Sequence, residues 1–384
     1  MAGNGISRRT LLGSMAGSVA GSLALAGCGQ TRSPRYEGWL FVASAAESGI
    51  AVADLSEFRR ATTIALPKPP RQILLAGERV FAACPDAQAI FEIEPDRLKA
   101  GAKIGLPGQF IACAAAPDGS RLAAITRNPA RLYVIDPATR KQRAVALPEA
   151  PAALDLSTDT AAITTEGNSL MRVSLSSGQV LGTTPLGLRC DLVRFRKDGK
   201  AILTGAAGEN QIVTVDTATG KLFARLPLAF LPRRFCFTDD GGQMFVTGVS
   251  DDSIVVVSPY QSEVDETMIG GQRPLAMAVA VSQGRNLLFV TNAGSGDLTI
   301  FDIDSRQMAS SVHIGGNVGE VLITPDGNYA MVIDRDSGDA SVVRMSTALD
   351  HKLPAAMSYG TRPLFTVFRT GGAPQAAAIV PKAV

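Results

Sequence analysis

The chain has little of what metal and haem sites usually need. Only two of its 384 residues are His, and its five Cys form no Cys-x-x-Cys pair, so the sequence does not indicate a zinc ribbon or c-type haem attachment. Its 37 basic and 35 acidic residues leave a net charge of only +2, which argues against a nucleic-acid partner. Aromatic residues are scarce at 5%, whereas 46% of residues are hydrophobic and 38 are Gly. This composition is that of a globular protein with many tight turns.

Long apolar runs and catalytic motifs are missing as well. The apolar stretch at residues 11–26 is diluted by Gly and Ser and is shorter than the roughly 20 apolar residues that a membrane-spanning helix needs. There is no Gly-x-Ser-x-Gly elbow, no His-Glu-x-x-His motif and no phosphate-binding loop. Neither His313 nor His351 has a partner that the sequence makes evident. No catalytic residue can therefore be named from the sequence.

Residues 1–27 are set aside from the fold because they resemble an export signal. Arg8 and Arg9 stand in a run that resembles the twin-arginine signal, and Leu25-Ala26-Gly27-Cys28 resembles the lipobox of bacterial lipoproteins. The resemblance implies cleavage before Cys28 and diacylation of its thiol. Residues 28–35 would then be a lipidated tether, and 36–384 a single domain. Loss of Arg8 and Arg9 would bring the net charge from +2 to 0.

The resemblance also implies an address for the protein. We expect an exported chain that a lipid anchor holds on the periplasmic side of the cell envelope. Gly29, which follows the lipidated Cys, favours the outer membrane by the sorting pattern of such lipoproteins.

From residue 36 onward one pattern recurs about every 40 residues. In its clearest copy, 273–315, four short apolar segments are separated by polar or Gly-rich turns, as expected for four antiparallel strands. Asp-Gly pairs precede several second strands, for example Asp118-Gly119 and Asp326-Gly327. Aligned second and third strands give eight hairpins: 40–43 with 50–54, 80–83 with 90–93, 122–126 with 132–136, 161–164 with 170–173, 202–205 with 212–216, 244–248 with 254–257, 287–292 with 298–302, and 329–333 with 340–345.

Repeated four-stranded units of this length predict an all-β fold, a β-propeller. The count favours eight blades, and seven stays open if the weak copy at 72–104 is irregular. The first unit begins with its second strand, so its innermost strand must come from elsewhere. Residues 362–368 near the C-terminus are similar to 273–279, an innermost strand. We therefore predict that 362–368 complete the first blade and close the ring.

At this level the chain resembles the YVTN-type β-propeller repeat family. The motifs that carry the resemblance are Phe289-Val290-Thr291-Asn292, Phe245-Val246-Thr247-Gly248 and Thr324-Pro325-Asp326-Gly327. It covers nearly all of the chain after residue 36. A WD40 repeat is disfavoured because Trp39 is the only Trp and the Gly-His and Trp-Asp markers are missing.

Arginines recur at one position of the repeat, just before or at the start of an innermost strand. This position lies on the rim of the central channel, and Arg offers a planar fork that suits carboxylate or phosphate. We predict a ligand-binding rim, and pairing of each Arg with an acidic residue of a neighbouring blade is the alternative. The rim residues are Arg71, Arg189, Arg233, Arg234, Arg273 and Arg362.

Other polar side chains are expected on the same face without a clear role. Asp334, Asp336 and Asp339 lack a full calcium-loop motif, so no metal site is assigned. Three Cys, at 113, 190 and 236, fall on innermost strands, and Cys84 ends a second strand. Buried thiols are favoured for these four, although export would permit disulfides.

The function hypothesis that follows is a membrane-anchored binding or scaffold protein. Its partner would be an envelope protein or a small anionic ligand at the channel mouth, and we expect a monomer without a cofactor. The alternatives are a lactonase-like hydrolase and a quinoprotein or haem-type oxidoreductase. Fold alone does not decide among them.

Overall fold

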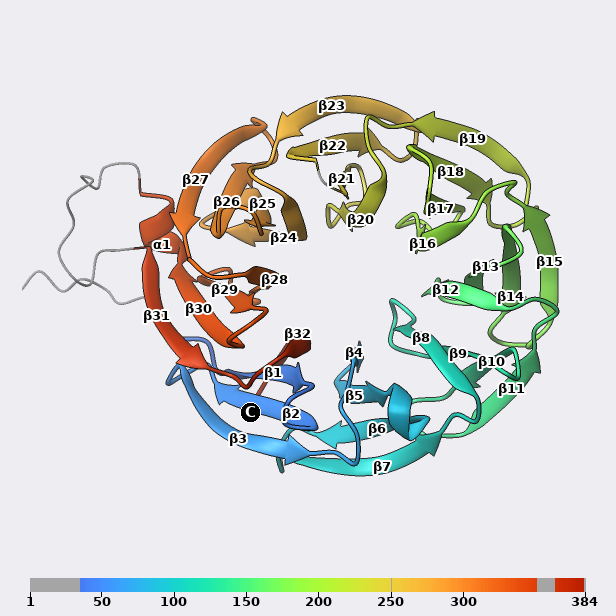
Figure 1. Ribbon diagram of the computed structural model, residues 1–384, viewed down its shortest axis with the longest axis horizontal. Coiled ribbons are helices and arrows are strands. Elements are labelled where there is room, and N and C mark those ends of the chain that lie inside the picture. Colours follow the sequence, from blue (N-terminus) through green and yellow to red (C-terminus); the bar gives the residue numbers. More distant parts are fainter. Residues whose placement is uncertain (1–34, 250, 351–362, 383–384) are drawn as a thin grey trace, which may run out of the picture. The chain divides into compact units, whose positions relative to one another are not determined.

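The computed structural model describes residues 35–249, 251–350 and 363–382. These residues form eight four-stranded antiparallel sheets arranged as blades around a central axis (Figure 1). The fold class and the blade count of eight are confirmed, and the weak copy that starts at residue 72 is a regular blade. The predicted export signal at residues 1–27 and most of the predicted tether, up to residue 34, lie outside the described residues.

Each blade contributes one strand to each of four concentric layers. The innermost strands are β32 (Pro374–Pro381), β4 (Gln72–Ala76), β8 (Gln109–Ala115), β12 (Pro151–Leu156), β16 (Cys190–Phe195), β20 (Pro232–Phe237), β24 (Pro274–Ser282) and β28 (Val318–Ile323). The second strands are β1 (Gly38–Ser44), β5 (Arg79–Cys84), β9 (Leu122–Arg127), β13 (Thr160–Thr165), β17 (Ala201–Ala206), β21 (Met244–Gly248), β25 (Arg285–Asn292) and β29 (Tyr329–Asp334).

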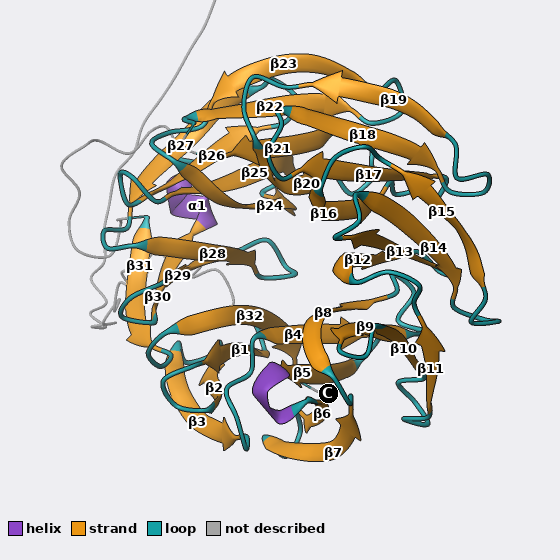
Figure 2. Cartoon of the chain, turned by 45° about the vertical axis from the view of Figure 1, so that its right-hand side comes forward, coloured by secondary structure: helices purple, strands orange, loops and turns teal. Residues whose placement is uncertain are grey.

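The outer two layers follow the same order around the ring. The third strands are β2 (Gly49–Asp54), β6 (Ala89–Glu94), β10 (Arg131–Ile135), β14 (Ser169–Ser174), β18 (Gln211–Asp216), β22 (Ser253–Ser258), β26 (Asp297–Asp302) and β30 (Asp339–Arg344). The outermost strands are β3 (Arg59–Ala65), β7 (Lys99–Gly105), β11 (Gln142–Ala146), β15 (Val180–Pro185), β19 (Leu222–Pro227), β23 (Glu263–Ile269), β27 (Gln307–His313) and β31 (Leu364–Arg369). The described residues also form two short helices, η1 (Pro85–Ala87) and α1 (Met345–Ala348), and helices are purple in Figure 2.

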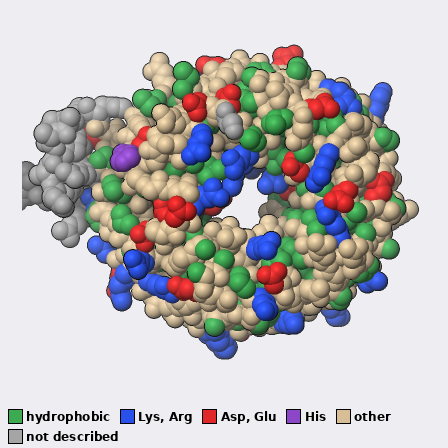
Figure 3. Space-filling view, in the orientation of Figure 1, with side chains coloured by type: hydrophobic (Ala, Val, Ile, Leu, Met, Phe, Trp, Pro, Cys, Tyr) green, Lys and Arg blue, Asp and Glu red, His purple; other side chains and the backbone are tan. Residues whose placement is uncertain are grey.

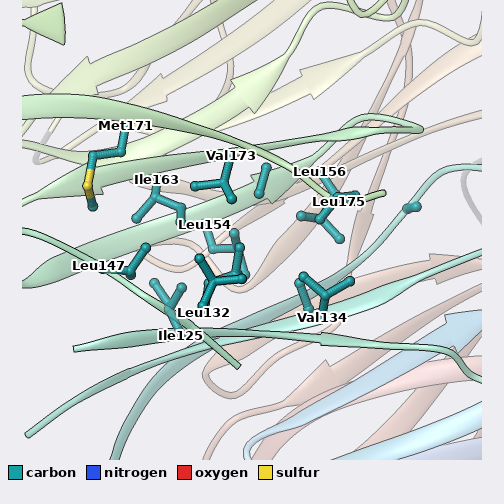
Figure 4. Close-up of a cluster of buried hydrophobic side chains, with 14 residues drawn as sticks. Ile125, Leu132, Val134, Leu147, Leu154, Leu156, Ile163, Met171, Val173 and Leu175 are labelled. Atoms are coloured by element: carbon teal, nitrogen blue, oxygen red, sulfur yellow. The ribbon is translucent and has the colours of Figure 1, made fainter. Parts of the chain in front are cut away.

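The apolar core lies between the blades. The described residues form eight buried clusters, one for each pair of neighbouring blades. Figure 4 shows the cluster between the third and fourth blades, where Ile125 and Leu132 face Leu154 and Ile163. Because the middle strands pack on both faces, a strand such as β14 is buried along its whole length, whereas an outermost strand such as β15 alternates between half-buried and exposed residues. No blade can bury its faces without both neighbours.

The ring is closed by β32, which pairs antiparallel with β1 from Gly38–Pro381 to Ala43–Ala376. The prediction of closure by a C-terminal strand is confirmed, but the segment was wrong. Most of the predicted segment is β31, the outermost strand of the eighth blade. It alternates in exposure because one of its faces meets solvent. The true closing strand is rich in Ala, which has weak strand propensity, so its sequence gave little signal.

Polar contacts reinforce the closure at the end of β32. The Lys382 ammonium donates to both Asp54 oxygens at 2.9 and 3.0 Å and lies 4.5 Å from the centre of the Trp39 ring. Burial raises the pKa of Asp54, but hydrogen bonds from Ser56 and Lys382 outweigh it and leave the pKa below its ordinary value of 3.8. Burial likewise lowers the pKa of Lys382, but Asp54 and Glu37 leave it above 10.5.

Deletion of residues 370–384 is expected to destabilise the ring, because the first blade would lose its innermost strand. The expected loss is at least about 3 kcal/mol, the order of exposing two or more core side chains, measured by urea unfolding followed by circular dichroism. Deletion of residues 383–384 alone is the control and should change little. Equal stability of the two truncated chains would show that β32 does not close the ring.

The Asp54–Lys382 contact is expected to make stability depend on pH. A lowered Asp pKa stabilises above about pH 4 and loses its effect as pH falls through the folded value, whereas a raised Lys pKa stabilises below about pH 10 and loses its effect as pH rises. Asp54→Asn should therefore lower the melting temperature by about 2 °C at pH 7 and not at pH 2, on the order of 1 kcal/mol for a partly exposed pair. A difference that is the same at both pH values would contradict this.

Candidate functional site

The start of each innermost strand and the loop between the second and third strands lie at one end of the channel. Antiparallel pairing fixes this arrangement, since Pro232 of β20 stands opposite Gly248, the last residue of β21. In the space-filling view, Lys and Arg side chains gather around the central opening over β20, β24 and β28 (Figure 3). We call this end of the channel the mouth.

β-bulges mark the mouth in seven of the eight blades. In each of these blades the register of the innermost strand shifts near its first residue, and β4 of the second blade is the exception. A bulge inserts one extra residue and re-aims side chains. In β20 the extra residue is Arg233, in β16 it is Asp191, and in β32 it is Gln375. The scaffold thus presents a different side chain at the same place in each blade.

Threonines near the ends of two second strands, β13 and β25, hold the bulges of their blades. The Thr164 hydroxyl accepts a hydrogen bond from the Ala153 amide at 3.1 Å, and Thr291 accepts one from Ala276 at 3.1 Å. Both hydroxyls are fully buried, so the bulged amides are satisfied without water. Thr291 belongs to the Phe-Val-Thr-Asn motif, and this contact is the structural reason for a Thr at that position.

A cavity of about 170 Å³ lies at the mouth between the sixth and eighth blades. We call it the arginine pocket. Arg233 and Arg234 come from β20, Glu320 from β28, and Arg335 from the loop between β29 and β30. The remaining lining comes from β24, β28, β29 and β32: Leu275, Gly319, Ile333, Pro374, Gln375, Ala376 and Ala377.

The charges in the arginine pocket are only partly balanced. Arg234 donates to the Glu320 carboxylate, with 2.9 Å between Nη2 and Oε1, and both side chains are 42% exposed. The pKa of Arg233 lies below its ordinary value because of partial burial and the positive charges of Arg234 and Arg335. Within the described part of the chain, neither Arg233 nor Arg335 has a carboxylate partner. Three guanidiniums and one carboxylate leave a net charge of +2.

The stem of Arg335 reaches the pocket over Gly319. A Cβ at Gly319 would lie 2.6 Å from Arg335 Cγ and 2.9 Å from the carbonyl oxygen of Ile333. Such contacts are too short for any larger residue, so the glycine makes room for the arginine.

The other predicted rim arginines lie outside this pocket. Arg273 is engaged by two other loops, because its amide donates to Asp252 at 2.8 Å and its guanidinium to the Ala293 carbonyl at 3.1 Å. Arg189 stands before β16, and Arg71 lines a separate, open cavity with Gln88, Gln109 and Asn128. Arg362 lies outside the described residues and precedes an outermost strand, so its assignment to an innermost strand was wrong.

Sequence reasoning missed two members of the pocket, Arg335 and Glu320. Arg335 stands between Asp334 and Asp336, two of the residues that the sequence suggested for calcium. In the structure Asp334 accepts hydrogen bonds from the amides of Asn317, Asp336 and Ser337, which makes it a turn residue. Among the described residues, no group of three His, Cys, Asp or Glu is placed to hold a metal ion.

The remaining reactive side chains lie away from the pocket. His313 ends the outermost strand β27, where Nδ1 lies 2.7 Å from Asp297, and His351 is outside the described residues. Cys84, Cys113, Cys190 and Cys236 are free thiols. Burial raises the pKa of Cys84 to about 12 and that of Cys190 to about 11, so little thiolate exists at neutral pH. No helix of the described chain is long and apolar enough to cross a membrane.

Comparison with known proteins identifies the fold. No family model and no curated protein matches the chain, so the YVTN-type resemblance stays a prediction. Three solved structures show the range of likeness. The dihydro-heme d1 dehydrogenase NirN in complex with DHE has a TM-score of 0.72 and 13% identity over 91% of this chain and 77% of NirN. Apo AztD from Citrobacter koseri has a TM-score of 0.66 and 13% identity, and the match covers 90% of this chain and 99% of AztD. The Kuenenia stuttgartiensis hydrazine synthase has a TM-score of 0.54 and 16% identity, and the match covers 73% of this chain and 96% of the hydrazine synthase chain.

The likeness to NirN contradicts the prediction of no cofactor. NirN, a dihydro-heme d1 dehydrogenase, shares this architecture, and its structure is a complex with DHE. The prediction of a protein without a cofactor is therefore withdrawn. The residues that line the arginine pocket include no His, Cys, Met or Tyr, so the pocket offers no axial ligand for a haem iron. At 13% identity, the likeness shows that this chain is a β-propeller.

Proposed function

We propose that the protein is an exported, lipid-anchored β-propeller of the bacterial cell envelope that binds a small anion in the arginine pocket. The observation that carries the proposal is the pair of guanidiniums, Arg233 and Arg335, without a carboxylate partner among the described residues. Guanidinium groups bind carboxylate and phosphate through charge-assisted hydrogen bonds. The pKa of Arg233 is lowered by burial first and then by the positive charges of Arg234 and Arg335, and an anion beside Arg233 would offset the repulsion from those charges.

The course of the chain agrees with a lipid anchor at Cys28. Gly38, where β1 begins, pairs with Pro381 at the end of β32, whereas the pocket uses the first residues of β32. The chain therefore enters the propeller at the end of the channel opposite the mouth. An anchor ten residues before Gly38 can reach no more than about 35 Å. Such an anchor would keep the end of the channel opposite the mouth near the bilayer, so the mouth would be open to soluble ligands.

A haem-type oxidoreductase is the second candidate, and the likeness to NirN favours it. A visible absorption band in the protein purified from its own cells would support a bound tetrapyrrole. Such a band would not by itself place the tetrapyrrole in the arginine pocket.

Arg233→Gln and Arg335→Gln are each expected to weaken anion binding about tenfold or more, the usual loss for a hydrogen bond to a charged group. The measurement is isothermal titration with sulfate, phosphate, succinate and citrate, supported by the rise in melting temperature on binding. The full chain with Cys28→Ser would be used so that no detergent is needed.

Two further variants serve as controls for this experiment. Arg369→Gln, whose side chain is 89% exposed on β31, should bind as the wild type does. Glu320→Gln removes the internal carboxylate and should bind anions more tightly. Unchanged affinity after removal of both Arg233 and Arg335 would refute the proposed site.

The lipid anchor has its own test. Cys28→Ser is expected to release the protein from the membrane fraction into the soluble periplasmic fraction, because the acylated thiol is lost. The measurement is cell fractionation with immunoblotting. If the variant stays with the membrane as the wild type does, the anchor is not at Cys28.

A further inference from the structure

The arginine pocket has a charge pattern that selects among anions. This inference rests on the proposed function. Its starting point is the net charge of +2, since Arg234 is neutralised by Glu320 at 2.9 Å while Arg233 and Arg335 are not. A ligand with two negative charges balances the pocket, whereas a monoanion leaves one guanidinium without a counter-charge.

The two unpaired cations come from different blades. Arg233 extends from the bulge of β20 in the sixth blade, and Arg335 from a loop of the eighth blade. Between them the seventh blade contributes Leu275, which carries no charge. The ligand that fits this order carries its charges at two ends with an uncharged middle. A phosphate carries its charge on oxygens around a single atom, so it spans a shorter distance between the two flanks than a dicarboxylate does.

The lining of the pocket from β32 of the first blade is also uncharged. There β32 contributes Ala376 and Ala377, and Ile333 of β29 lies beside Gly319. These residues carry no charge, so the middle of a ligand at this place meets neither a cation nor a carboxylate of the protein.

The volume limits the length of the ligand. The cavity of about 170 Å³ is slightly larger than the roughly 150 Å³ cavity that holds one benzene molecule. A dicarboxylate of four or five carbons, with eight or nine non-hydrogen atoms, is of this size class. We propose that the arginine pocket binds a short aliphatic dicarboxylate, with one carboxylate on Arg233 and the other on Arg335.

The test compares anions of matched size on the full chain with Cys28→Ser. Isothermal titration with malonate, succinate, glutarate, butyrate and inorganic phosphate is expected to show succinate or glutarate as the tightest ligand, at least about tenfold tighter than butyrate and phosphate. Butyrate has the carbon skeleton of succinate with one carboxylate fewer, so it isolates the effect of the second charge.

Arg335→Gln gives the decisive variant. It should lower succinate affinity about tenfold and leave butyrate affinity within about twofold, so that the preference for the dianion is lost. Arg71→Gln, at another position on the mouth, should change neither affinity.

The outcomes separate this inference from the proposed function. If phosphate binds more tightly than every dicarboxylate and still requires Arg233, the ligand class is wrong and the anion site stands. If Arg71→Gln weakens succinate as much as Arg335→Gln does, binding is spread around the mouth and the two-point arrangement is wrong. If the folded protein binds none of these anions, both proposals fail.

Discussion

Ring closure is the constraint on which the rest of this structure depends. The apolar clusters lie between blades, so each blade is stable only when both neighbours are in place. The interface between the first and eighth blades joins residues almost 300 positions apart, for example Leu40 and Tyr329. Pairing of β32 with β1 supplies the innermost strand of the first blade at that interface. The arginine pocket uses β32 as one wall, so the site exists only in the closed ring.

At the mouth, most blades share the same backbone conformation but present different side chains. Bulges recur in seven blades, and buried threonines satisfy bulged amides in blades as different as the fourth and the seventh. The side chain at the bulge varies freely, from Arg233 to Asp191 and Gln375. The sequence repeat therefore explains the backbone conformation at the mouth, but it does not indicate which ligand binds there. Chemistry must be argued from the residues in which one blade differs from the next.

The same distinction explains which features could be predicted from the sequence. All eight hairpins were found, because their middle strands are buried on both faces and form unbroken apolar runs such as 287–290. The closing strand was missed because Ala376, Ala377 and Ala378 have little strand propensity, and pairing with a strand 330 residues away leaves no local pattern. Periodicity placed Arg233 and Arg234 at the mouth. Periodicity could not reveal Arg335, because this residue lies in a loop of another blade. It reaches the same pocket as Arg233 and Arg234 only because the blades form a ring.

Glu320 shows how the pocket remains stable with three arginines. Without a carboxylate, three guanidiniums around one small cavity would repel one another and weaken the contact between the sixth and eighth blades. Glu320 compensates one charge and joins the two blades at 2.9 Å, although β24 of the seventh blade stands between their innermost strands. Complete compensation would fill the site with the protein's own carboxylates and leave nothing for a ligand. Partial compensation reduces the repulsion in the free protein and leaves Arg233 and Arg335 available, so binding of an anion and stability of this part of the ring are linked.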